Sequence, residues 1–266
     1  MSDERPIGVF DSGLGGLTVV RAIRERLPRE RLVYYGDTAR FPYGSKSQES
    51  VAKFSWEAVR FFQSHNAKCI VIACNTASAF ALPEIQGKCD MPVIGVIEPG
   101  ARAAVKLTAR GKIGVIGTTA TINSDAYTHA IRRLKPSAVV YAQPCPLLAP
   151  LAEEGWVHKP ATQLVIEEYL SPLRTARIDT LVLGCTHYPL LAGPIQAFMG
   201  DDVRLVDSAS TCAAELVELL DARTLLSDAA GGDELFFVTD MAARFSEVGT
   251  RFMGRSLQAI KVVGAE

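Results

Sequence analysis

The stretch IGVFDS at residues 7–12 returns, slightly altered, as IGVIGT at residues 113–118, which is 106 positions further on. A second pair lies downstream of each copy: IVIACNT at residues 70–76 resembles LVLGCTH at residues 181–187, 111 positions further on. Each stretch is a short apolar run that ends in small polar residues, as expected of a strand covered on both faces and followed by a turn. Because both motifs occur in the same order, the chain is predicted to contain two similar α/β units.

Further runs rich in valine and isoleucine alternate with helix-like stretches. The predicted strands are residues 7–10, 32–35, 69–73, 93–97, 113–116, 138–141, 180–183, 203–206 and 235–238. The predicted helices include residues 17–27, 47–65, 101–108, 124–134, 161–171 and 211–220. This alternation indicates an α/β fold in which each unit has a mainly parallel sheet flanked by helices. The offset of 106 also relates Tyr35 to Tyr141.

The repeats also suggest where the units begin and end. We expect residues 91–111 to cross from the first unit to the second, and residues 206–208 to lead back. Residues 1–98 together with 208–266 are thus predicted as a first, discontinuous domain, and residues 99–207 as the second. The tail contains a predicted strand and two helices, which we assign to the first domain.

Composition excludes several classes of protein. The 266 residues are 48% hydrophobic, and 28 basic side chains nearly balance 29 acidic ones, for a net charge of -1. A near-neutral chain lacks the dense basic face that broad nucleic-acid binding requires. No apolar run approaches the roughly 18 residues of a membrane span, and the start MSDERP does not resemble a signal peptide. We therefore expect a cytoplasmic protein without nucleic-acid or membrane partners.

Two of the six cysteines are candidates for chemistry. Most buried cysteines simply pack as small apolar groups, and no pair here has the spacing of a zinc site. Cys74 and Cys185, however, end equivalent strands of the two repeats. In open α/β sheets, ligands bind beyond the carboxyl ends of the strands. If the units face each other, the cleft between them presents one thiol on each wall.

The turns around these cysteines carry further candidate residues. The glycine-rich turn after residue 12 fails the dinucleotide fingerprint, because Thr18 stands where its last glycine is needed. We hypothesise that Asp11 assists Cys74 and that a Glu153–His187 pair assists Cys185, although either acid has a solvated or salt-bridged role as its alternative. Helix capping is the alternative for the polar turn residues. The remaining candidates for ligand binding are Ser12, Tyr43, Gly44, Asn75, Thr76 and Thr186.

Two opposed thiols have a chemical meaning. Inverting a stereocentre that bears an acidic hydrogen requires a base on one face and a conjugate acid on the other. A pair of cysteines can exchange these roles between the two directions of the reaction. General acid–base catalysis is most efficient when the pKa values of such groups are matched to the working pH.

Taken together, IGVFDSGLGGLT at residues 7–18, the turn PYG at 42–44, CNTAS at 74–78 and GCTHYP at 184–189 resemble the glutamate racemases, a cofactor-independent family of the aspartate/glutamate racemase superfamily. The resemblance implies two similar α/β domains with the substrate between them and a C-terminal segment that returns to the first. It further implies an isomerase that needs neither cofactor nor metal and supplies D-glutamate for peptidoglycan and cell shape in the bacterial cytoplasm. A homodimer is expected from the same resemblance. The short segment before the first strand argues against activation by a peptidoglycan precursor.

The resemblance also implies roles for individual residues. Cys74 would act on D-glutamate and Cys185 on L-glutamate, with Asp11, Glu153 and His187 as auxiliary proton-handling groups. Substrate would be bound by Asp11, Ser12, Tyr43, Gly44, Asn75, Thr76, Thr186 and His187. Three alternatives stay open: a racemase for aspartate or hydantoins, a cysteine hydrolase built on Cys185 and His187, and a glutamate-binding protein without catalytic activity.

Overall fold

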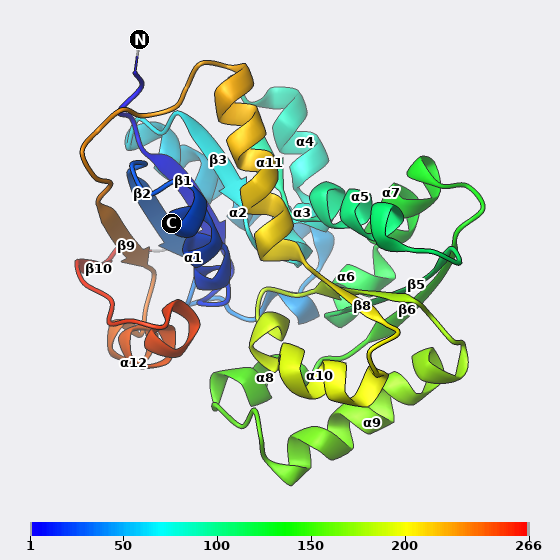
Figure 1. Ribbon diagram of the computed structural model, residues 1–266. Helices are drawn as coiled ribbons and strands as arrows, with labels where there is room; N and C mark the ends of the chain where they lie inside the picture. Colours follow the sequence, from blue (N-terminus) through cyan, green and yellow to red (C-terminus); the bar gives the residue numbers. More distant parts are fainter. Residues whose placement is uncertain (1, 265–266) are drawn as a thin grey trace.

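The computed structural model describes residues 2–264 and contains two entirely parallel sheets with helices on both faces (Figure 1). In spatial order, the first sheet consists of β10 (Ile260–Val262), β9 (Glu234–Val238), β2 (Leu32–Gly36), β1 (Ile7–Asp11), β3 (Cys69–Ile72) and β4 (Val93–Gly95). The second consists of β6 (Val139–Pro144), β5 (Lys112–Gly117), β7 (Thr180–Gly184) and β8 (Arg204–Asp207). The predicted α/β class with two parallel sheets is confirmed.

The internal repeat is visible in the pairing of the strands. The order β2-β1-β3-β4 in the first sheet has the same pattern as β6-β5-β7-β8 in the second. The register is kept as well, because Ile7 lies opposite Cys69 and the equivalent Ile113 lies opposite Thr180. The two central strands of each unit therefore carry their polar ends to equivalent places.

One detail of the predicted repeat was wrong. Tyr141 does not occupy the position of Tyr35: Tyr35 lies opposite Phe10, whereas Tyr141 lies opposite Gly114, two residues earlier in the ladder than Ile116, the equivalent of Phe10. The connection before β6 differs in length from that before β2, so an offset taken from the central strand does not hold for its neighbour.

Twelve α-helices cover the sheets of the described chain, several of them too short to show a helical period in the sequence. Their bounds are α1 Leu17–Arg26, α2 Gln48–Ser64, α3 Asn75–Phe80, α4 Leu82–Lys88, α5 Ile97–Leu107, α6 Thr119–Asn123, α7 Ala126–Leu134, α8 Leu148–Glu153, α9 Pro160–Thr175, α10 Ala192–Met199, α11 Ser208–Ala222 and α12 Ala242–Met253. Two 3₁₀ turns follow strand ends, η1 (Tyr43–Ser45) and η2 (Tyr188–Leu191). Among the described residues, no helix is both long and apolar enough to cross a membrane.

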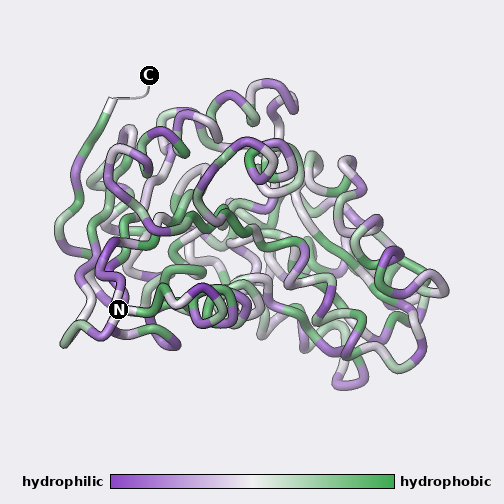
Figure 2. Tube along the Cα trace, turned by 90° about the horizontal axis from the view of Figure 1, so that it is seen from above, coloured by the Kyte–Doolittle hydropathy of each residue, from purple (hydrophilic) through white to green (hydrophobic). Residues whose placement is uncertain are grey.

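Each sheet is buried on both faces, which explains why its strands are continuous apolar runs. Neighbouring residues of a strand point to opposite faces, and Val9 and Phe10 accordingly join different apolar clusters of the first sheet. Val115 and Ile116 are divided in the same way in the second sheet. In Figure 2 the hydrophobic stretches run through the middle of the molecule, with hydrophilic positions on the outer turns of the helices.

Two helices lie where the chain passes between the sheets. Helix α5 leads from β4 to β5 and packs against α7 and β7 of the second sheet. Helix α11 leads back from β8 and packs against α1 of the first sheet, and it also contacts α5 (Figure 1). The strands β9 and β10 that follow then extend the first sheet beyond β2.

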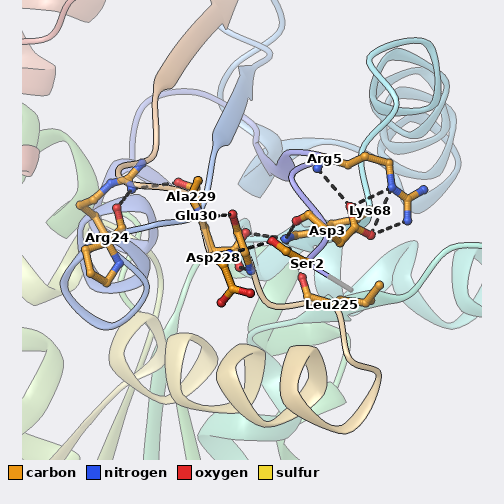
Figure 3. A network of polar contacts seen from close by, with 11 residues as sticks. Ser2, Asp3, Arg5, Arg24, Glu30, Lys68, Leu225, Asp228 and Ala229 are labelled. Atoms are coloured by element: carbon orange, nitrogen blue, oxygen red, sulfur yellow. Dashed lines mark hydrogen bonds and ion pairs between the residues drawn. The ribbon is translucent and has the colours of Figure 1, made fainter.

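A buried ion pair fastens the first sheet at the end opposite to the cysteine turns. Lys68 Nζ lies 2.5 Å from Glu30 Oε2, and neither side chain is more than 2% exposed. The same ammonium donates to the carbonyl oxygens of Asp3 and Leu225, at 2.7 and 2.6 Å (Figure 3). The cation thereby ties the start of the chain and the segment after α11 to the amino end of β3.

Replacing Lys68 by methionine should lower the free energy of unfolding by about 3–5 kcal/mol, because the Glu30 carboxylate then stays buried without its partner. The double variant Lys68→Met/Glu30→Leu should recover much of that loss. Urea unfolding followed by circular dichroism measures both. Lys88→Met, which breaks the exposed pair with Glu84, serves as the control and should change little. If Lys68→Met and Lys88→Met lowered the free energy of unfolding equally, the buried pair would not have the stabilising role assigned to it.

Candidate active site

A cavity of about 400 Å³ opens between the two sheets, at the carboxyl ends of their strands. It brings together side chains of both units, as expected of a ligand site in open α/β sheets. The residues singled out in the sequence that line it are Ser12, Tyr43, Gly44, Cys74, Asn75, Thr76, Glu153, Cys185, Thr186 and His187. Asp11, which is 1% exposed, does not line it and is buried close behind Cys74.

Cys74 stands at the start of α3, just after β3. Its Sγ accepts a hydrogen bond from the backbone N–H of Ala77, and its S–H donates to Ser12 Oγ. The donor–acceptor distance is 3.5 Å in both. Burial and the nearby Asp11 carboxyl raise the pKa of the Cys74 thiol to about 12. This cysteine is therefore a protonated acid near neutral pH.

Cys185 has a different neighbourhood on the opposite wall. Its Sγ lies 3.7 Å from Nδ1 of His187, whose Nε2 lies 2.9 Å from Glu153 Oε1. Burial alone lowers the pKa of His187, but the hydrogen bonds to Cys185 and Glu153 outweigh it and raise that pKa to about 10. Cys185 therefore lies beside a cationic imidazole that Glu153 holds in place.

Asp11 is a buried acid beneath the first thiol. One of its oxygens, Oδ2, accepts from the backbone N–H of Gly13 over 2.9 Å. Burial raises the pKa of Asp11, against the opposing effect of the His187 charge. The carboxyl is thus close enough to influence both cysteine turns without lining the cavity itself.

Polar side chains join the two units around the cavity. Thr76 Oγ1 shares hydrogen bonds with the hydroxyls of Thr118 and Thr121, at 3.0 and 3.1 Å. The hydroxyl of Tyr127 donates to Asn75 Oδ1 over 2.8 Å, whereas Asn75 Nδ2 is buried and has no hydrogen-bond partner among the described residues. A buried amide N–H₂ without a partner at a cavity wall is suited to bind a ligand carboxylate.

The glycine turn after β1 presses directly on the second cysteine turn. Thr18 Oγ1 donates to the carbonyl oxygen of Thr186 over 3.0 Å. A Cβ on Gly15 would lie 2.2 Å from Thr186 Oγ1 and 2.4 Å from the His187 ring, so any larger residue would force the walls apart. Gly15 of the glycine-rich turn therefore serves the contact between the units.

Tyr43 lines the cavity, and its hydroxyl is bound within the first unit. Its hydroxyl donates to the Asp37 carboxylate, and the side chain is 1% exposed. Asp37 also pairs with Arg40 at 2.7 Å, so the hydroxyl of Tyr43 belongs to a structural network. The turn lines the cavity with Pro42, Tyr43 and Gly44.

Some residues that line the cavity were not singled out from the sequence. Thr118 is equivalent to Ser12 in the repeat, so the matching turns in the sequence could have identified it as a lining residue. Phe41 stacks on His187 with ring centroids 6.0 Å apart, and Arg244 reaches the cavity from α12. Neither had a signal, because each arrives from a segment without a repeat partner. Within the described residues, no group of three or more His, Cys, Asp or Glu side chains could hold a metal ion.

Known proteins resemble this chain over nearly its whole length. The sequence model of the Asp/Glu/Hydantoin racemase family matches residues 7–216. A glutamate racemase of Syntrophus aciditrophicus is 49% identical over 97% of this chain and 96% of its own. Among solved structures, a glutamate racemase of Bacillus anthracis has a TM-score of 0.95 and 41% identity, covering 98% of both chains. One from Francisella tularensis, solved with D-glutamate, has a TM-score of 0.93 and 40% identity, covering 99% of both.

The imidazole of His187 should stay protonated up to about pH 10, because its pKa is raised from the usual 6.5 by Cys185 and Glu153. The stability that this proton contributes is fully present below pH 6.5 and is lost as the pH rises through 10. Imidazole nitrogen chemical shifts measured by NMR test this, with His187→Gln for assignment. Glu153→Gln should lower the pH at the midpoint of the His187 titration. Titration of His187 near pH 6.5 in the wild type would contradict the geometry.

Proposed function

Since the chain belongs to the Asp/Glu/Hydantoin racemase family, we propose that it interconverts L- and D-glutamate by proton transfer at the α-carbon, and thereby supplies D-glutamate for peptidoglycan. One observation carries the mechanism: Cys74 and Cys185 follow equivalent strands of the two units and line one cavity. The relatives named glutamate racemase carry the choice of substrate.

In the direction from L- to D-glutamate, the Cys185 thiolate removes the α-hydrogen as a proton. The electron pair of the broken C–H bond stays on the α-carbon and is delocalised into the adjacent carboxylate. The Cys74 thiol then delivers its proton to the opposite face. The product leaves Cys74 as thiolate and Cys185 as thiol, which is the state required for the reverse direction.

The surroundings of the thiols support this assignment of starting states. Nδ1 of the His187 imidazolium lies 3.7 Å from the sulfur of Cys185, the group that removes the proton of L-glutamate in the proposed reaction. The raised pKa of Cys74 keeps its proton available for delivery. Glu153 holds the imidazole in place, and Asp11 adds a second acidic group near Cys74.

The carbanionic transition state needs hydrogen bonds in a site that excludes water. Asn75 Nδ2 is a buried donor without a partner among the described residues, and Ser12, Thr76 and Thr186 also line the cavity. These groups and the Tyr43–Gly44 turn would hold the two carboxylates of glutamate. Cys74 and Cys185 are each only 6% exposed, which keeps the transferred protons away from bulk water.

The domain boundaries and the setting of the protein form part of the same proposal. Residues 1–98 with 208–266 would form one domain and residues 99–207 the other, which is supported by the pairing of β9 with β2 and by the packing of α5 on β7. The resemblance to bacterial glutamate racemases favours a homodimer in the bacterial cytoplasm.

Incubation with L-glutamate in deuterium oxide tests the reaction. The wild type should incorporate deuterium at the α-carbon with inversion, and Cys74→Ser and Cys185→Ser should each reduce racemisation at least about 10²-fold, since each removes one proton-transfer group. Proton NMR and chiral chromatography measure the two quantities.

Cys89→Ser is the matched control, because Cys89 follows α4 and does not line the cavity. Racemisation that survives either change at Cys74 or Cys185 would refute the two-thiol mechanism. The Cys185–His187–Glu153 chain also resembles the core of a cysteine hydrolase, which predicts a burst of acyl-enzyme and full activity without Cys74. Faster exchange of aspartate than of glutamate would reassign the substrate.

A further inference from the structure

We infer that α12 belongs to the catalytic apparatus, and that its Arg244 is a positioning residue that acts through Glu153 on the contact between His187 and Cys185. The inference rests on the proposed racemisation. Helix α12 comes from the tail of the chain and packs against α1 and β10. One of its faces nevertheless reaches across the cleft to the second unit.

The residues of this face are spaced by helical turns. Arg244 and Arg251 are seven residues apart, which places them two turns apart on the same side of the helix. Phe252 follows, and its ring meets that of His187 edge-on with centroids 5.3 Å apart. In Figure 1, α12 lies at the lower end of the first unit, on the side of α8.

Arg251 anchors the end of α8. Its Nη1 donates to the backbone carbonyl of Glu153 over 2.6 Å. Glu153 is the last residue of α8, where carbonyl groups lack helical partners and a cation is favourable. Gly155 has a φ of 69°, and a Cβ there would lie 3.5 Å from the Arg251 guanidinium. The turn after α8 is thus fitted to α12.

Arg244 reaches the carboxylates themselves. Its Nη2 lies 3.2 Å from Glu154 Oε1 and 3.6 Å from Glu153 Oε2. The other oxygen of Glu153 faces His187 Nε2. Glu153 is therefore shared between the arginine and the imidazole. Among the described residues that line the cavity, Arg244 is the only lysine or arginine.

The charges around His187 determine in which direction Arg244 shifts the pKa of the imidazole. The imidazole faces Cys185 on its own turn, Glu153 on α8 and, further away, Asp11 at the end of β1. Arg244 counteracts the pull of Glu153 on the imidazolium proton. It also offsets Glu154 at a cavity that must admit two substrate carboxylates. Without Arg244, Glu153 holds the imidazolium proton of His187 more tightly. The uncompensated Glu154 carboxylate then repels the carboxylates of the substrate.

Arg244→Gln should raise the KM for both enantiomers about fivefold, as loss of a half-exposed ion pair allows, and should lower kcat less. Because the enantiomers have equal free energy, kcat/KM must stay equal in the two directions. The basic limb of its pH profile should move to higher pH. Arg244→Lys should retain most of the wild-type behaviour, and Arg244→Gln/Glu154→Gln should recover much of the KM.

Arg255→Gln is the control, since it removes a similarly exposed arginine that pairs with Glu234 away from the cavity. A KM and pH profile for Arg244→Gln equal to those of this control would overturn the inference and leave the proposed function intact. A loss of activity without any shift of the pH profile would reduce Arg244 to a structural residue and overturn it too. If the wild type fails to exchange the α-hydrogen, the proposed function itself is wrong.

Discussion

Contact between the two units at the ends of their central strands is the constraint on which the site depends. Gly15 allows the first glycine turn to touch Thr186 and His187, and Thr18 holds the carbonyl of Thr186. A second contact joins the units where the hydroxyls of Thr76, Thr118 and Thr121 bond to one another. Two flexible walls could not hold two sulfurs toward one carbon atom. These contacts fix the distance between the walls by van der Waals contact and hydrogen bonds.

The units have the same backbone plan but different electrostatics. Cys74 lies near a buried carboxyl and a serine hydroxyl, and burial keeps it protonated. Cys185 lies near an imidazole that is itself held by Glu153. A symmetric pair of thiols would have no preferred starting state. In the proposed reaction, these different surroundings of a repeated core would give each thiol its own role in each direction.

Much of this arrangement could be predicted from the sequence, because the repeat reports both the fold and the equivalence of the cysteine turns. An apolar run followed by Cys-Asn-Thr or Cys-Thr-His predicts a strand, the residue at which it ends and the polar groups that follow it. What could not be predicted depends on distant segments. Strand β10 has three residues and pairs only at an edge. The hydroxyl of Tyr43 binds Asp37, and α12 reaches His187 from the tail. Neither contact leaves a periodic pattern.

The order of the strands has a consequence for synthesis of the chain on the ribosome. Strand β2 is an interior strand of the finished sheet, yet its neighbour β9 begins only at Glu234. All of the second sheet is translated before β9 emerges, and during that time one edge of β2 has no partner. Open strand edges are templates for intermolecular pairing. The nascent chain therefore carries this open strand edge until Glu234–Val238 has been translated, and the pairing of β9 with β2 closes it.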